Sequence, residues 1–375
     1  MDKFIWSNIQ ESRKYVVPLL LLSVFLFSCT DKRELRLNVW KGFAPEFARV
    51  EFQKQMQEKY GIEVKVLVQN PVNEDDFYNS IIDGSADLIS ASHYLFHGPT
   101  YKYLQDKLLL EVDTKKLSNY KNLYPIFANF SFLKDQGKLY GVPLENSSYR
   151  LIYNSNKVER KPRSWKVLWD PKFKGKYSVS EYYFETNFYI TALVSGVPME
   201  KIFDVEHVLL NKTFLKNFDY LALNARAYWD DLERPVDIKG SHVATAFGNF
   251  VDQLKPKEDW KFSNPSEGVP GSMDFMVMNR KTLGDSKKVL LAHEWINFTI
   301  SEYYQREVIM KGNGEMPVIS KFKTPLSKYQ KDRFMFENIS YYENKRFLWP
   351  PRSREALRSM KKAWVSALSK REKKL

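Results

Sequence analysis

Cys29 is the only cysteine among the 375 residues of this chain, and this limits how the fold can be stabilised. A disulfide needs two cysteines, so no bridge can form within the chain. A chain of this length must therefore be held together by burial of apolar side chains, and 43% of its residues are hydrophobic and 15% aromatic. This composition is typical of a globular protein and not of a disordered one. The length favours two lobes over one.

The position of Cys29 predicts export. Positively charged residues precede an apolar run at 16–27, which is shorter than the roughly 20 residues of a membrane-spanning helix but has the length of a signal-peptide core. The sequence Leu26-Phe27-Ser28-Cys29 resembles a bacterial lipobox, in which the cysteine becomes an acylated N-terminus. We therefore expect residues 1–28 to be a lipoprotein signal peptide and Cys29 to carry lipid. The chain would then be anchored on the periplasmic or cell-surface side of a bacterial membrane, unless the segment stays as an uncleaved signal anchor.

The chain is basic, with a net charge of +13, but its cations are spread along the sequence. One concentrated run lies in the tail, at 361–374. We interpret it as a solvated face and not as a nucleic-acid or membrane patch, because an exported protein rarely meets nucleic acid. We therefore expect no nucleic-acid partner, and we expect a monomer.

The first hundred residues alternate between strand and helix patterns. Apolar residues at every second position predict strands at 35–39 and 62–68, and a short third strand covers 87–90. A helix begins after Pro45, with Phe47, Val50 and Met56 on its apolar side, and ends at Gly61; a second helix runs from 73 or 74 to 83 and ends at Gly84. This is a β-α-β-α-β unit, and the loops after its strands, at 40–43, 68–72 and 90–94, lie where open α/β sheets bind ligands.

Two later breaks in the pattern predict two crossings between lobes. The first is at 140–143, before a strand-rich region that includes 153–154, 165–175 and 177–179. The second is a glycine and proline cluster at 265–271, followed by an apolar strand at 275–278 and a long helix at 287–311. We therefore expect a two-lobed α/β protein.

Motifs of enzymes are absent from the sequence. It contains no G-x-x-x-x-G-K, no G-x-G-x-x-G and no G-x-S-x-G. The five histidines are scattered, and only His93 and His97 have a spacing that could suit a metal, for which packing is the alternative. We expect no catalytic residue, no cofactor and no metal site.

Seven segments together resemble the spermidine/putrescine-binding lipoproteins of bacterial ABC importers. They are residues 37–45, 60–64, 87–94, 140–143, 154–158, 164–175 and 267–274. The resemblance implies the type II periplasmic-binding-protein fold, in which each lobe is a mixed sheet flanked by helices and two crossings join the lobes. The first lobe would contain 29–141 with 276–320, and the second 142–275 with 321–375.

The resemblance also implies a ligand site. A polyamine is an apolar rod with cationic ends, so it needs carboxylates at its ammonium groups and aromatic faces along its methylenes. The residues at the matching positions are Trp40, Phe43, Tyr94, Glu185, Phe247, Asp274 and Glu315. The alternatives are core packing for the aromatic residues and an interlobe ion pair for Asp274.

Some positions depart from the family pattern. Asn146 and Ser272 stand where the family has tryptophans, Glu315 replaces an aromatic residue, and Glu145 is a further carboxylate. These changes favour a cationic, hydrogen-bonding ligand that differs from spermidine. The pair Tyr182-Tyr183 resembles ferric-ion receptors of the same superfamily, with strand packing as the alternative.

The sequence therefore predicts a solute-binding lipoprotein that captures a polyamine-like or other cationic solute and delivers it to an ABC permease. Two alternatives stay open. One is a lipoprotein of the same fold that acts as a sensor, an adhesin or a scavenger without transport. The other is an enzyme built on a bilobed frame.

Overall fold

The computed structural model describes residues 31–229, 238–247, 259–334, 344 and 346–372. Cys29 and the predicted signal peptide lie outside the described residues, so lipidation stays a prediction. In the described part of the chain, no helix has both the length and the apolar character needed to cross a membrane.

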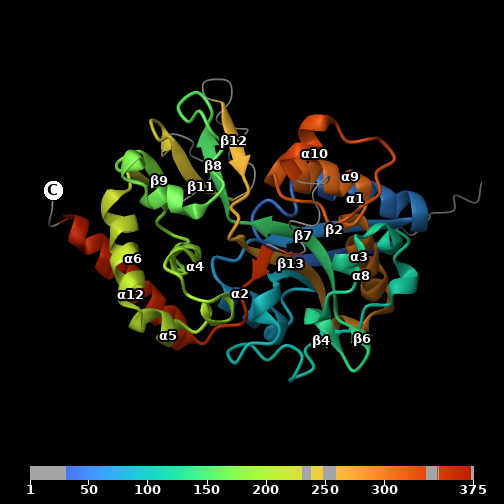
Figure 1. The fold of residues 1–375 in the computed structure, drawn as a ribbon. Coiled ribbons are helices and arrows are strands. Elements are labelled where there is room, and N and C mark those ends of the chain that lie inside the picture. Colours follow the sequence, from blue (N-terminus) through green and yellow to red (C-terminus); the bar gives the residue numbers. More distant parts are fainter. Residues whose placement is uncertain (1–30, 230–237, 248–258, 335–343, 345, 373–375) are drawn as a thin grey trace, which may run out of the picture.

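The first lobe is built on a mixed sheet, drawn mainly in blue and green in Figure 1. Its strands lie in the order β14-β13-β3-β1-β2, and β4 and β7 also pair with β13. The strand bounds are β1 Asp31–Asn38, β2 Ile62–Gln69, β3 Leu88–Ser92, β4 Leu109–Leu110, β7 Gly141–Ser148, β13 Val269–Asn279 and β14 Arg346–Leu348. The helices on this side are α1 Glu46–Tyr60, α2 Glu74–Asp83, α3 Pro125–Ala128, α8 Ser286–Thr299, α9 Glu302–Tyr304 and α10 Lys328–Phe334, and a small hairpin adds β5 Lys134–Asp135 and β6 Lys138–Leu139.

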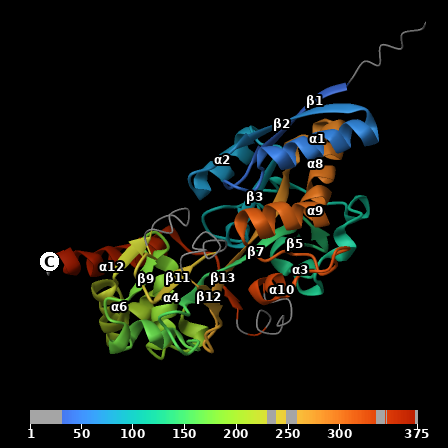
Figure 2. The ribbon, with the colours of Figure 1, turned by 90° about the horizontal axis from the view of Figure 1, so that it is seen from above.

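The second lobe has its own five-stranded sheet, in the order β10-β9-β11-β8-β12. Its strands are β8 Arg150–Asn154, β9 Tyr177–Ser180, β10 Ala227–Trp229, β11 Val243–Ala246 and β12 Trp260–Ser263. Its helices are α4 Phe184–Val194, α5 Val205–Leu210, α6 Lys212–Asn224 and α12 Arg354–Glu372. The last helix, α12, runs beside α6 on the outside of this lobe, far from the start of β1 (Figures 1 and 2).

Two antiparallel strands, β7 and β13, connect the lobes. They pair from Gly271 opposite Ser148 to Val277 opposite Gly141, and a β-bulge interrupts the ladder between Asp274 and Phe275. A bulge bends the strands locally and re-aims side chains, which is why bulges recur beside functional sites. The two crossings predicted from the sequence are therefore one paired hinge, from which the lobes extend in opposite directions (Figure 2).

Each lobe has its own hydrophobic core. One cluster contains residues between Leu35 and Leu144 and between Met273 and Ile319, and the other contains residues between Tyr149 and Val269 together with residues between Trp349 and Ala367. We keep the residue boundaries of the two lobes as a proposal, with two changes. Phe322 packs against the first cluster, and β14 pairs with β13 in the first-lobe sheet, so parts of 321–375 lie on the first lobe.

The first helix buries a different face from the one predicted. Phe47 and Val50 are 48% and 54% exposed, while Ala48, Phe52 and Met56 are buried. Residues spaced by four lie on one side of a helix, and this stripe, not the one through Phe47, faces the sheet. The prediction for Phe47 and Val50 is wrong. The left-handed Gly61 ends the helix as expected, at φ 65°.

Two other local predictions are also wrong. The predicted helix 287–311 ends at Thr299, and a π-helical segment, Gln305–Asn313, follows α9. The Gln305 amide donates to the carbonyls of Thr299 and Leu144, which fixes the break against the hinge. Residues 165–175, expected to be strand-rich, instead form 3₁₀ turns at Trp165–Trp169 and Pro171–Phe173, capped by Ser164 and Asp170. Serine and aspartate side chains favour such caps because they accept from free backbone N–H groups.

Candidate functional site

The carboxyl end of β3 pairs with the hinge strand β13, and β1 lies beside β3. Trp40 follows β1, its backbone N–H donates to Ser90 Oγ at 3.1 Å, and its ring lies edge-on to Phe77 at 4.7 Å between ring centres. At the end of β3, Ser92 Oγ donates to Asp274 Oδ1 at 2.5 Å. The predicted loop positions are therefore next to the hinge, as expected for ligand sites at the ends of α/β strands.

Asp274 is a buried carboxylate on the hinge strand β13. Its residue is 6% exposed, and among the described residues no lysine, arginine or histidine forms an ion pair with it. Burial raises the pKa of its carboxyl to about 6, against the hydrogen bond from Ser92, which lowers it. A charge without compensation in a buried position is costly, so this carboxylate is suited to a cation that comes from outside the chain.

Tyr94 lies at the centre of a charged cluster. It stands in the 3₁₀ turn that follows β3, and its hydroxyl donates to Glu74 Oε1 at 3.2 Å. The guanidinium carbon of Arg352 is 5.1 Å from the centre of the Tyr94 ring. Burial raises the pKa of the Tyr94 hydroxyl well above its usual value. The negative charges of Glu74, Glu185 and Asp274 raise this pKa further, and the positive charge of Arg352 lowers it. All four charges thus act on one hydroxyl.

Glu185 comes to this cluster from the second lobe. It is in the first turn of α4, and its Oε1 is 3.8 Å from an Nη of Arg352. Burial raises the pKa of its carboxyl, while Arg352 lowers it. The predicted carboxylate is therefore near the predicted aromatic residue Tyr94, with an arginine between them that the sequence reasoning missed.

Glu315 is a further carboxylate close enough to Asp274 for their charges to interact. It follows the left-handed Gly314, which ends the π-helical segment. Burial raises the pKa of its carboxyl to about 8, and the charge of Asp274 acts in the same direction. A hydrogen bond with Ser147 and the positive charges of Arg150 and Arg333 lower this pKa. The charge of Asp274 thus raises the pKa of both Tyr94 and Glu315.

The positions that depart from the family pattern lie on the hinge. Glu145 is opposite Asp274 on β7 and is 2% exposed. Asn146 exchanges backbone hydrogen bonds with Met316, at 3.2 and 3.3 Å, and Ser272 is opposite Ser147. The loop that carries Glu315 is therefore fixed to the hinge strand directly.

Phe43 and Phe247 are core residues. Each is 7% exposed, Phe43 in the first cluster and Phe247 in the second. The Phe43 carbonyl accepts from Tyr304, and the Phe247 ring is 4.7 Å from that of Tyr183. The packing alternative is favoured for both, and their contact with a solute stays a prediction.

His93 also belongs to the hinge region. Its Nδ1 accepts from the backbone N–H of Met273 at 3.3 Å, so its Nε2 carries the proton and donates to the Trp349 carbonyl at 2.9 Å. Both ring nitrogens are therefore used in hydrogen bonds, which fits the packing alternative and not a metal ligand. Across the described residues, no three histidine, cysteine, aspartate or glutamate side chains are grouped so that they could hold a metal ion.

Two residues of this site were missed because the sequence has no local signal for them. Arg352 follows Pro350-Pro351 in a segment that matches no motif, and Glu74 is one acid among several at the start of α2. Only the tertiary fold brings them to Tyr94. No periodicity or spacing would have selected them.

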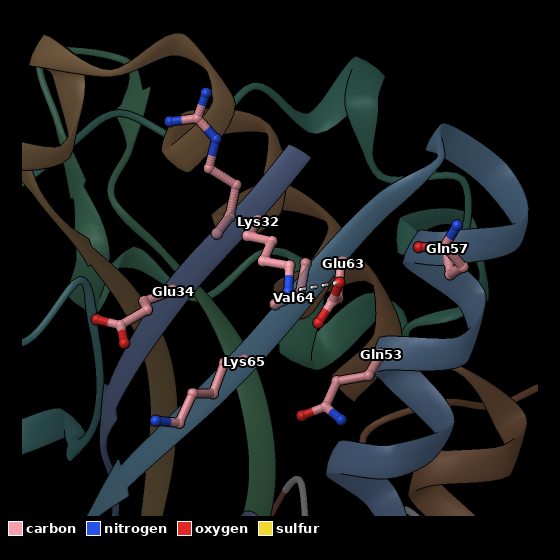
Figure 3. A pocket seen from close by; sticks show the side chains of 8 residues that line it. Lys32, Glu34, Gln53, Gln57, Glu63, Val64 and Lys65 are labelled. Carbon is pink, nitrogen blue, oxygen red and sulfur yellow. Dashed lines mark ion pairs between the residues drawn. The ribbon is translucent and has the colours of Figure 1, made fainter. Parts of the chain in front are cut away.

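A separate depression of about 530 Å³ lies at the other end of the first-lobe sheet, between α1 and the start of β1 and β2 (Figure 3). Exposed charged and amide side chains surround it, and Lys32 pairs with Glu63 at 3.6 Å. It is at the amino end of β1, whereas Trp40 follows the carboxyl end. It is therefore not part of the hinge site.

Comparison with known proteins agrees with the resemblance in the sequence. The Escherichia coli spermidine/putrescine-binding periplasmic protein is 25% identical over 160 residues, and the match spans 42% of each chain. A spermidine/putrescine ABC transporter substrate-binding protein from Streptococcus pneumoniae has a TM-score of 0.70 at 17% identity, covering 90% of this chain and 99% of the other. A lipoprotein of Treponema pallidum has a TM-score of 0.64 at 17% identity, with coverages of 89% and 99%.

These structural similarities confirm the two-lobed type II periplasmic-binding-protein fold. The model of the bacterial extracellular solute-binding protein family matches residues 83–341, which is more than half of the chain. This match includes parts of both lobes and the hinge strands between them. The chain therefore belongs to the family of bacterial extracellular solute-binding proteins.

Proposed function

We propose that this protein captures a small organic cation beside its hinge and delivers it to an ABC permease. The observation that carries the proposal is Asp274, a buried hinge carboxylate whose only side-chain hydrogen bond within the described residues comes from Ser92. A solute ammonium would supply the missing countercharge. The binding energy would then come from an interaction that the empty protein lacks.

The surroundings of Asp274 support an amine ligand. Tyr94 and Trp40 are at the ends of the neighbouring strands, and both are partly exposed aromatic residues. Cation–π contacts contribute roughly 0.5 to 2 kcal/mol each. Glu185 belongs to the second lobe and Tyr94 to the first, so a solute bound beside them would contact both lobes.

The relatives support the class of solute. Two of the similar proteins are named for spermidine and putrescine, and both belong to ABC transport systems or the periplasm by name. We propose the same class, a polyamine-like or other cationic solute, for this chain. The protein would act as a binding component without chemistry of its own.

Lipid anchoring is part of the proposal. A Treponema pallidum lipoprotein shares the fold, and Cys29 lies in a lipobox-like sequence. In cells grown with radiolabelled palmitate, the parent protein should be labelled and Cys29→Ala should not. Equal labelling of both proteins would show that the lipobox interpretation is wrong.

Calorimetry tests the solute. The full mature chain is titrated with putrescine, spermidine and related monoamines, and the best ligand is then measured with Asp274→Asn. We expect a loss of about 2 to 5 kcal/mol, because the solute cation would be left uncompensated. Glu63→Gln, which removes an exposed carboxylate in the depression of Figure 3, is the matched control and should bind like the parent. Tight binding that Asp274→Asn does not change would exclude this site.

A further inference from the structure

The segment after β14 places an arginine inside the hinge site. The Arg352 side chain is only 7% exposed and pairs with Glu185 at 3.8 Å. Its guanidinium carbon is 5.1 Å from the centre of the Tyr94 ring and 5.5 Å from the Trp349 ring. A buried cation that contacts both an aromatic face and a carboxylate has the environment expected of a bound amine.

Contacts with both lobes hold this segment in place. On the first lobe, His93 donates to the Trp349 carbonyl at 2.9 Å, and Arg354 pairs with Asp75 at 3.0 Å. On the second lobe, Trp349 belongs to the hydrophobic core, and Arg352 Nη1 donates to the hydroxyl of Tyr189 at 3.4 Å. Arg352 is therefore a fixed part of the site and not a mobile surface side chain.

The fixed guanidinium changes which solutes fit. It already neutralises Glu185, so a second ammonium at this end of the site would meet a like charge and no free carboxylate partner. Like charges in a poorly solvated site repel strongly. One ammonium of a diamine would thus be attracted by Asp274, and the other would be repelled by Arg352.

Two buried N–H donors of this segment, one of them on Arg352, also need an acceptor. Arg352 Nε and Trp349 Nε1 are inaccessible to solvent and have no hydrogen-bond partner in the ranges that the structure describes. Buried donors without partners are rare and costly, and they are candidates for contacts with a ligand. A carboxylate is the acceptor that best matches a guanidinium.

We propose that the site selects a solute with one ammonium group and one carboxylate, with the ammonium at Asp274 and the carboxylate at Arg352. This inference rests on the proposed function and narrows its solute class from polyamines to amino acids with separated charges. Tyr94 would lie along the solute, because it stands two residues after Ser92, which donates to Asp274, and its ring centre is 5.1 Å from the guanidinium carbon of Arg352. Arg352 is then the residue that determines specificity.

Three amines that share a four-carbon chain test the proposal: putrescine, 1-aminobutane and 4-aminobutanoate. Calorimetry on the full mature parent should show 4-aminobutanoate binding at least ten-fold tighter than either of the others. In Arg352→Gln, 4-aminobutanoate should lose ten- to hundred-fold in affinity, and putrescine should gain about ten-fold because Glu185 is released. The ratio between the two solutes should thus change by about a hundred-fold or more.

Two further variants keep the test specific. Arg352→Lys retains the charge but lacks the guanidinium N–H donors, so it should bind 4-aminobutanoate about ten-fold more weakly than the parent, and it replaces the glutamine variant if that protein does not fold. Arg354→Gln removes the exposed arginine two residues further on and should leave the order of affinities unchanged. A melting curve for each variant establishes that it is folded.

The outcomes separate this inference from the proposed function. If the parent prefers putrescine, or if Arg352→Gln leaves the ratio of affinities as it was, the inference is overturned while amine binding stands. If the folded parent binds none of the three amines and no spermidine, the proposed function falls together with the inference.

Discussion

Replacing Asp274 by asparagine should make the unliganded protein more stable at alkaline pH, although it weakens solute binding. The carboxyl is buried on the hinge, and Ser92 is its hydrogen-bond donor. Burial raises its pKa from 3.8 to about 6. The amide is uncharged and of similar shape, and its oxygen can still accept from Ser92.

The size of the effect follows from this pKa. A rise from 3.8 to about 6 corresponds to about 3 kcal/mol, because one pKa unit is about 1.4 kcal/mol. The folded protein holds this proton more tightly than the unfolded chain does, so Asp274 makes stability fall as the pH rises from about 4 to about 6, and the full penalty remains above that window. Relative to the parent, Asp274→Asn should therefore gain about 1 to 3 kcal/mol between pH 4.5 and pH 8.

Urea denaturation followed by tryptophan fluorescence measures this difference. Comparing the two proteins at both pH values cancels any effect of the substitution that does not depend on pH, and Glu63→Gln serves as a control with an exposed carboxylate. The reasoning is refuted if the difference between parent and Asp274→Asn is the same at pH 4.5 and pH 8, or if the variant becomes relatively less stable at pH 8.

Three further predictions concern the site. Burial raises the pKa of Glu315 to about 8, and an ammonium favours its ionised form, so the affinity for the best amine should rise with pH between 6 and 8. Glu315→Gln should flatten this pH profile in calorimetry, and a steep profile in the variant would show that another group takes up the proton. Trp40→Ala should weaken binding of the same amine by roughly 1 to 3 kcal/mol in calorimetry. Phe47→Ala, on an exposed helix face, should leave the affinity unchanged, and equal losses in both variants would argue against a contact between Trp40 and the solute. A bound solute should close the lobes about β7 and β13, so small-angle scattering should give a smaller radius of gyration, and an unchanged radius with solute bound would contradict closure.

Local signals in the sequence were sufficient for much of the fold. The alternation in β2 and the Asn73 and Gly84 caps of α2 depend on neighbouring residues only, and these elements are found as predicted. The apolar face of α1 was misassigned, because Phe47 and Phe52 are equally apolar and only the sheet beneath the helix selects between them.

The candidate site could be predicted only in part. Asp274 and Tyr94 follow segments with recognisable patterns, and the fold brings them to the same hinge. Arg352 and Glu74 reach Tyr94 through long-range packing, of which the sequence gives no sign. The resemblance to polyamine-binding proteins therefore indicated the place of the site, but not the arginine within it.

Native mass spectrometry of the protein purified from its own cells tests the central claim most directly, because it requires no assumption about the solute. The account predicts one small adduct per chain, whose mass corresponds to a compound with a primary amine, and its loss in Asp274→Asn. A spectrum without any adduct, which also stays unchanged after addition of putrescine, spermidine, 1-aminobutane and 4-aminobutanoate, would contradict the account.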